Sequence, residues 1–173
     1  MFFYKEEERT INLHPSFFGP NITKYLDDQL LGDVEGTLQG DYFVVCVMQP
    51  HEYSDGKIVP GSSFAEFVVH YRAIVWKPFK GEVVDAQVTG VADNGFFCEI
   101  GPLKVFVSKS MIPSDIKYDG HATPPQWTDG ADQTIEKGTQ IRLKIKGMRT
   151  DMGSLYAIGT IKEDYLGVTE VSG

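Results

Sequence analysis

Lys77-Pro78-Phe79-Lys80-Gly81 is the stretch that divides this chain of 173 residues into two differently organised halves. Proline cannot donate a hydrogen bond to a neighbouring strand, and glycine frees the backbone, so the stretch predicts a joint. The chain is long enough for two small domains, each with its own core. We therefore expect one domain over residues 1–78 and a second over residues 79–173.

The half before the joint is predicted to consist of strands and one helix. Strand-like composition extends from Phe2 to Leu13, and alternating side chains from Phe64 to Trp76 predict a long strand. The run from Phe43 to Met48 is apolar throughout, which favours a central strand covered on both faces. A helix is expected to begin after Gly19-Pro20 and to end at Gly32 in a left-handed turn. Its apolar residues at helical spacing are Ile22, Tyr25, Leu26 and Leu30. This order predicts a small α+β domain.

The half after the joint consists of short alternating segments. Turns are predicted at Asp93-Asn94-Gly95 and Gly101-Pro102, and the polar stretch from Tyr118 to Gly138 is expected to be a long loop. Five short strands with a long third connection predict an all-β OB barrel. The apolar positions of these strands are Val84, Ala86 and Val88; Phe96, Cys98 and Ile100; Leu103, Val105 and Val107; Ile141, Leu143 and Ile145; and the run from Leu155 to Ile161.

Two aromatic side chains of the second half are predicted to face solvent. If Val105 and Val107 point into the barrel, Phe106 points out, and the same parity places Phe96 inside and Phe97 outside. An exposed aromatic ring on an OB face can hold an unstacked nucleic-acid base. The alternative is that the 118–138 segment or the first domain covers both rings.

One basic stripe interrupts an otherwise acidic chain. The net charge is −8, which excludes a protein that coats nucleic acid through bulk positive charge. Arg142, Lys144 and Lys146 nevertheless share one face of a predicted strand, and Arg149 follows closely. This stripe could follow a phosphate backbone, or it could be the solvated outer face of an amphipathic strand.

Catalytic chemistry finds little support in the sequence. The four histidines are scattered, the two cysteines lack metal-ligand spacing, and no phosphate-binding glycine loop occurs. The apolar runs are too short to span a membrane, and the acidic start does not suit a secretory signal. We expect an intracellular protein that is not an enzyme and that has no cofactor, no metal and no membrane partner.

Three long motifs resemble one family over nearly the whole chain. They are Leu13-His14-Pro15-Ser16-Phe17-Phe18-Gly19-Pro20, the stretch from Tyr71 through Trp76-Lys77-Pro78-Phe79 to Asp85, and Ile161-Lys162-Glu163-Asp164-Tyr165-Leu166-Gly167. Together they resemble the seventh subunit of eukaryotic RNA polymerase II, in particular its fungal members. The resemblance implies a ribonucleoprotein-like first domain and an OB second domain of the S-one type. It also implies pairing with the fourth subunit to form the polymerase stalk.

The resemblance further implies where the first domain docks. In this family, loops at the tip of that domain insert at the base of the polymerase clamp. The matching residues here are His14, Pro15, Phe17, Phe18, Gly19 and Pro20, with Val59, Pro60 and Gly61 from the second loop. Aromatic side chains on a rigid loop also suit an interface anchor on physical grounds. Phe17 could instead be a hydrophobic staple on the following helix.

In the same family, single-stranded RNA crosses the second and third strands of the S-one domain. Phe97 and Phe106 match the stacking positions, and Lys104 and Lys109 lie near them in sequence. Two other family positions differ, because Asn94 stands where the family has an aromatic residue and Ser154 where it has a basic one.

We therefore expect a non-catalytic stalk subunit in the nucleus. It would favour the closed clamp for initiation, contact the emerging transcript, and bind transcription factors that the sequence does not identify. Two alternatives are a free-standing S-one-type RNA-binding protein of translation or RNA decay, and the corresponding stalk subunit of another RNA polymerase.

Overall fold

The computed structural model describes residues 1–169, which form two compact units that divide between Lys77 and Pro78. None of the described helices is long and apolar enough to cross a membrane. The first unit contains β1 (Phe2–Leu13), the 3₁₀ turn η1 (Pro15–Phe17), α1 (Ile22–Val34), β2 (Leu38–Gln39), β3 (Tyr42–Tyr53), β4 (Lys57–Ile58) and β5 (Ala65–Trp76).

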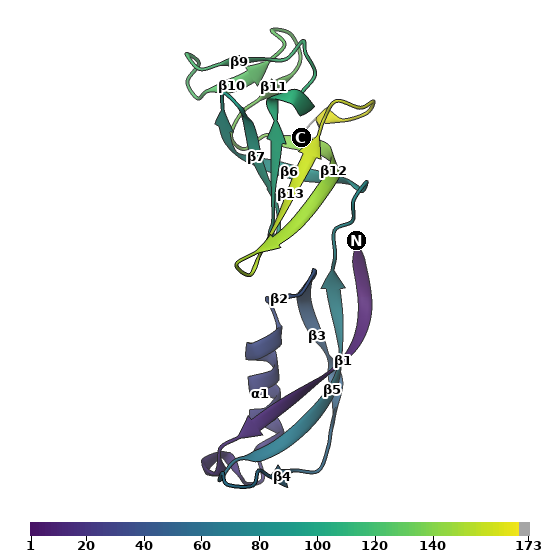
Figure 1. The fold of residues 1–173 in the computed structure, drawn as a ribbon, viewed down its shortest axis with the longest axis vertical. Helices are drawn as coiled ribbons and strands as arrows, with labels where there is room; N and C mark the ends of the chain where they lie inside the picture. The colour runs from purple at the N-terminus through teal and green to yellow at the C-terminus, as the bar shows by residue number, and fades with distance from the viewer. Residues whose placement is uncertain (170–173) are drawn as a thin grey trace. The chain divides into compact units, whose positions relative to one another are not determined.

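The core of the first unit lies between one face of its sheet and α1. The sheet has the order β1-β5-β3-β2, β4 pairs with the start of β5, and α1 lies against one face (Figure 1). Leu26, Leu30 and Val34 are spaced along one side of the helix and are fully buried against the sheet. The alternation along β5 is as predicted, because Phe67, Val69 and alternate residues up to Val75 point into this core. The predicted α+β domain is confirmed.

The helix ends later than the sequence suggested. Gly32 lies inside α1, which continues to Val34, and the glycine with a left-handed backbone is Gly36 at φ +70°. The longer helix places Val34 in the core, and this burial outweighs the modest cost of a glycine within the helix. Tyr25 was expected on the apolar face, but it is exposed because the buried positions follow the spacing of Leu26.

The apolar run in β3 is not a central strand covered on both faces. The central strand is β5, and β3 lies between it and the two-residue strand β2. Val44 is buried under the helix, whereas Val45 is 42% exposed beside an irregularity in the register. The unit has only one helix to cover its sheet, so the opposite face of β3 stays open.

The second unit is a closed barrel with short accessory elements, most of which lie between β8 and β12 in the chain. Its barrel strands are β6 (Val83–Ala92), β7 (Gly95–Ile100), β8 (Leu103–Ser108), β12 (Gln140–Asp151) and β13 (Ser154–Thr160). Their order is β13-β8-β7-β6-β12, and an additional β12–β13 pairing closes the ring. The inward residues that were predicted from alternation, including Phe96, Val105 and Leu143, are fully buried. The predicted five-stranded OB barrel is confirmed.

The 118–138 segment is more ordered than a long loop. Two of its three short strands lie wholly within it, and together the three form a small sheet over the end of the barrel. The large side chain of Trp127 is buried in it, and its indole N–H donates to the carbonyl oxygen of Ala92 at 3.0 Å. The mostly polar composition of residues 118–138 did not indicate that Trp127 would be buried and would anchor the segment. The remaining elements are η2 (Lys109–Met111), β9 (Lys117–Asp119), β10 (Gln126–Thr128), β11 (Thr134–Ile135) and β14 (Gly167–Val168).

Replacing Trp127 by phenylalanine tests this anchor. The ring stays apolar, but the carbonyl oxygens of Ala92 and Gly95 lose their indole donor. We expect the free energy of unfolding to fall by about 1 to 3 kcal/mol, the usual cost of leaving a buried polar group unpaired. Urea denaturation of the full chain measures it. An unchanged midpoint would show that the hydrogen bond does not hold the segment.

Candidate functional site

The outward pair of aromatic rings lies where the alternation placed it. Phe97 on β7 and Phe106 on β8 are directly opposite in the antiparallel register, and their ring centroids are 4.9 Å apart. Phe97 is 50% exposed, and Phe106 is partly buried. A large exposed ring forgoes the stabilisation that burial would give, which is typical of a binding surface.

An apolar groove extends from this pair across the neighbouring strands. It has a volume of about 610 Å³ and crosses β7, β8, β13 and the second half of β12. Its lining is mostly apolar, with basic groups at Lys104 and Arg149. Sequence reasoning identified four lining residues, Phe97, Lys104, Phe106 and Arg149. It missed Met148, Tyr156 and Ile158, although alternation along β13 could have placed the last two outside.

The predicted basic stripe does not join this groove. Arg142 donates to the Asp85 carboxylate at 2.8 Å, and this hydrogen bond raises the pKa of the guanidinium. Lys144 and Lys146 both donate to Glu163 at 2.9 Å and hold the pKa of that carboxyl below its usual range. These exposed ion pairs leave little free positive charge for a phosphate backbone.

Lys109, the last of the predicted basic contacts, also lies away from the groove lining. It begins the 3₁₀ turn η2, where its backbone N–H donates to the carbonyl oxygen of Asn94 at 2.8 Å. Its side chain is exposed at that turn. Of the basic residues that the sequence analysis singled out, Lys104 and Arg149 are therefore the two that line the groove.

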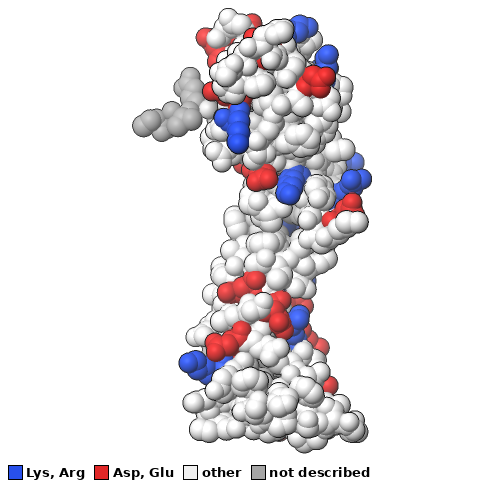
Figure 2. All heavy atoms as spheres, turned by 90° about the vertical axis from the view of Figure 1, so that its left-hand side faces the viewer, with Lys and Arg blue, Asp and Glu red and all other residues white. Residues whose placement is uncertain are grey.

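The two predicted docking loops lie side by side at one end of the first unit. The rings of His14, from the first loop, and Phe64, at the end of the second, meet edge to face with centroids 5.5 Å apart. Residues 13–23 and 58–65 contain no charged side chain. Figure 2 shows the corresponding end, lowest in the view, without red or blue atoms on the visible face. The two loops themselves are therefore uncharged, and apolar side chains are exposed on them.

The two adjacent phenylalanines of the first loop differ in their surroundings. Phe17 packs on Tyr25 of α1, with ring centroids 5.0 Å apart, as a staple on the helix would. Both rings are exposed, Phe17 at 44% and Phe18 at 41%, but Phe18 makes no such ring contact within the described residues, and its backbone N–H closes the 3₁₀ turn onto the carbonyl oxygen of Pro15. The fold therefore fixes the backbone beneath Phe18 while leaving its ring available.

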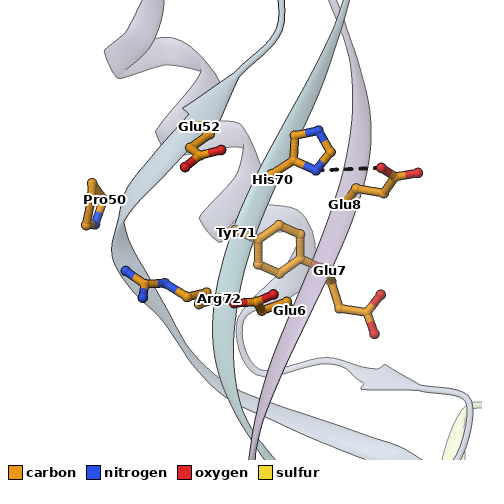
Figure 3. A pocket seen from close by; sticks show the side chains of 8 residues that line it. All are labelled: Glu6, Glu7, Glu8, Pro50, Glu52, His70, Tyr71 and Arg72. Atoms are coloured by element: carbon orange, nitrogen blue, oxygen red, sulfur yellow. Dashed lines mark ion pairs between the residues drawn. The ribbon is translucent and has the colours of Figure 1, made fainter.

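A second groove, of about 620 Å³, lies on the face of the first sheet that α1 leaves open (Figure 3). It is lined by acidic residues of β1 and β3 around His70 and Arg72 of β5. The His70 ring and the Glu8 carboxylate are 3.6 Å apart, the one ion pair drawn in Figure 3. The groove is broad and charged, and its lining includes no cysteine, serine or threonine that could serve as a nucleophile.

Residues of catalytic type also meet beneath α1. His51 is buried, its Nε2 lies 3.6 Å from Asp27, and neither ring nitrogen makes a hydrogen bond. The Tyr53 hydroxyl donates to Asp27, and burial, followed by this hydrogen bond, raises the pKa of Tyr53. The cluster belongs to the packing between α1 and β3. Among the described residues, no group of three or more His, Cys, Asp or Glu side chains is placed to hold a metal ion.

Comparison with known proteins agrees with the two folds. Residues 8–63 match the SHS2 domain found in the N terminus of Rpb7p/Rpc25p/MJ0397, and residues 77–156 match the S1 RNA binding domain. The chain is 55% identical over 170 residues to the RNA polymerase II subunit rpb7 of Schizosaccharomyces pombe, covering 96% of this chain and 98% of the relative. The chain belongs to the RNA polymerase II subunit 7 family.

Other members of the subunit 7 family match over similar lengths. The Saccharomyces cerevisiae subunit is 44% identical over 96% of this chain and 99% of its own length. The Dictyostelium discoideum subunit is 44% identical over 97% of this chain and 99% of its own length. The resemblance found in the sequence motifs is thus confirmed, as is the prediction that the chain belongs among polymerase subunits rather than free-standing enzymes.

Proposed function

We propose that this chain is the stalk subunit of RNA polymerase II, that its barrel binds the emerging RNA, and that its first unit docks on the polymerase. The observation that carries the proposal is the outward-facing Phe97–Phe106 pair on a barrel that matches the S1 RNA binding domain. The rings provide a stacking surface for unpaired bases, which does not require a basic domain. The polymerase supplies the transcript at high local concentration, so modest intrinsic affinity suffices.

Docking on the polymerase is supported by the two loops at one end of the first unit. Exposed apolar side chains on loops that contain no charged residue are suited to a desolvated protein interface, because the loops themselves bury no ion. We propose that this end binds at the base of the clamp, with His14, Phe18 and the 58–63 turn as contacts. Contacts made only with the closed clamp would raise the fraction of polymerase molecules whose clamp is closed, and this would favour initiation.

Pairing with the fourth subunit is supported by the open face of the first sheet. Cross-strand register places Phe2, Trp76 and Phe43 in one row, and Tyr4, Ile74 and Cys46 in the next. Phe2 and Tyr4 are both more than half exposed. A second polypeptide that covered these rows would bury apolar surface that α1 cannot reach. We propose this face as the principal contact of the fourth subunit, and the nucleus as the place where the complex works.

Affinity purification tests the assembly. The full chain, tagged and expressed in its source cells, should recover the fourth subunit and the large subunits of RNA polymerase II from nuclear extract. Recovery of another polymerase's large subunits would assign the chain to a different stalk. A chain that stays monomeric and binds RNA tightly without polymerase subunits would point to a free-standing S1 protein.

A further inference from the structure

The outer face of the barrel carries two rows of side chains that run across its strands. In the first row the register aligns Phe97 with Phe106, Phe106 with Ile158, and Ile158 with Gly147. In the second row it aligns Lys104 with Tyr156, and Tyr156 with Arg149. All of these residues except Gly147 carry side chains, so the first row ends at bare backbone on β12.

The spacing of the two rows suits a flat ring. Residues two apart on one strand, such as Tyr156 and Ile158, lie about 6.8 Å apart on the same face. That spacing is about twice the rise of about 3.4 Å between stacked bases. One base can therefore enter between the rows and contact both. The missing side chain at Gly147 opens the β12 end of this slot, where a Cβ would meet no atom within 4 Å.

A local irregularity of β12 brings a positive charge to the slot. Strict alternation from Ile141, Leu143 and Ile145 would point the odd-numbered residues inward, and these three are fully buried. The register shifts between Ile145 and Gly147, which turns Gly147 and Arg149 to the outside. Arg149 thereby lies beside Tyr156 at the rim of the groove.

The charges at this rim are available to a ligand. Within residues 1–169, neither Lys104 nor Arg149 forms an ion pair, unlike the three cations of the basic stripe. Glu99 lies opposite Lys104 on β7, so the second row carries two positive charges and one negative. An apolar slot with a net positive rim is complementary to an unpaired base and its phosphate, and less so to an acidic or a purely apolar partner.

We propose that this slot is a second base-binding subsite, separate from the Phe97–Phe106 stack. In it an unpaired RNA base lies between Tyr156 and Ile158, its edge over Gly147 and beside Met148, while Arg149 contacts the adjoining phosphate. The subsite rests on the proposed RNA-binding function of the barrel.

Filling the slot tests the subsite directly. Gly147→Val places a β-branched side chain in the open space without entering the left-handed backbone region that only glycine tolerates. The probe is a fluorescent single-stranded oligouridine RNA, titrated with the full chain and followed by anisotropy. We expect Gly147→Val to weaken binding about tenfold, the loss of one stacked base. Gly147→Ala should give a smaller loss.

A charge variant provides an independent check that does not depend on packing. Arg149→Gln should weaken binding and reduce the slope of affinity against salt by about one phosphate contact. Lys162→Gln removes the same charge from an exposed position outside the groove and should have no such effect. Thermal denaturation of each variant reports whether the barrel is intact.

The outcomes separate the subsite from the function on which it rests. If Gly147→Val and Arg149→Gln bind RNA normally while the Phe97→Ala, Phe106→Ala variant does not, the subsite is wrong and the RNA-binding function stands. If the unmodified chain binds no RNA, both fail.

Discussion

Changing Phe97 and Phe106 together to alanine should weaken binding of single-stranded RNA about 10- to 100-fold. Base stacking on an aromatic side chain contributes about 1 to 3 kcal/mol per base. The two rings are in contact across β7 and β8, with centroids 4.9 Å apart, and so act on the ligand as one surface. Each single variant should therefore lose a large part of the combined effect, and the two losses should not add. Anisotropy titration of the full chain with the oligouridine probe measures all three variants.

Association with the polymerase provides the control for this result. The pair lies on the barrel, and Phe97 is already half exposed, so its removal should cost little folding stability. The double variant should still be retained by polymerase during affinity purification. If its affinity for RNA equals that of the unmodified chain, the exposed pair has another role and the RNA-binding proposal loses its main support.

The second large effect concerns Phe18 and its anchoring of the first unit. Phe18→Ala should weaken association with the core polymerase about 30-fold or more, because a buried aromatic anchor at an interface typically contributes at least about 2 kcal/mol. The ring is exposed in the free chain, so the folding stability should remain close to that of the unmodified chain. Retention of the tagged chain on immobilised polymerase at increasing salt measures the loss.

Phe17 offers a matched control at the adjacent position. Phe17→Ala removes the ring that packs on Tyr25, so it should lower the free energy of unfolding by about 0.5 to 1.5 kcal/mol and weaken docking less. The reverse pattern, with Phe17 essential for retention and Phe18 dispensable, would exchange the roles of the two residues. RNA affinity of the chain should be unaffected by either change.

Local patterns predicted those elements whose residues alternate between buried and exposed. The alternation in β5, β7, β8 and the first half of β12 correctly separated inward from outward side chains, including Phe96 from Phe97. Such patterns work because successive side chains of a strand point to opposite faces. The same reasoning identified the outward-facing aromatic pair, two of the residues that line the candidate groove.

Patterns failed where a distant contact outweighed a local preference. Gly32 favoured a helix end, but the burial of Val34 against the sheet extends α1 past it. The apolar run in β3 suggested cover on both faces, yet nothing in the run shows that the unit has a single helix. The polar 118–138 segment concealed Trp127, whose burial depends on the end of the barrel.

The sequence by itself determined the two-domain division, the classes of both folds, the family and the outward direction of Phe97 and Phe106. Only the tertiary structure decided which residues share a surface. It paired the basic stripe with Asp85 and Glu163, and it brought Arg149 beside Tyr156 through a register shift that alternation cannot anticipate. The physical reason is that side-chain direction follows from local backbone geometry, whereas neighbours across strands depend on register and on ion pairs between residues far apart in the chain.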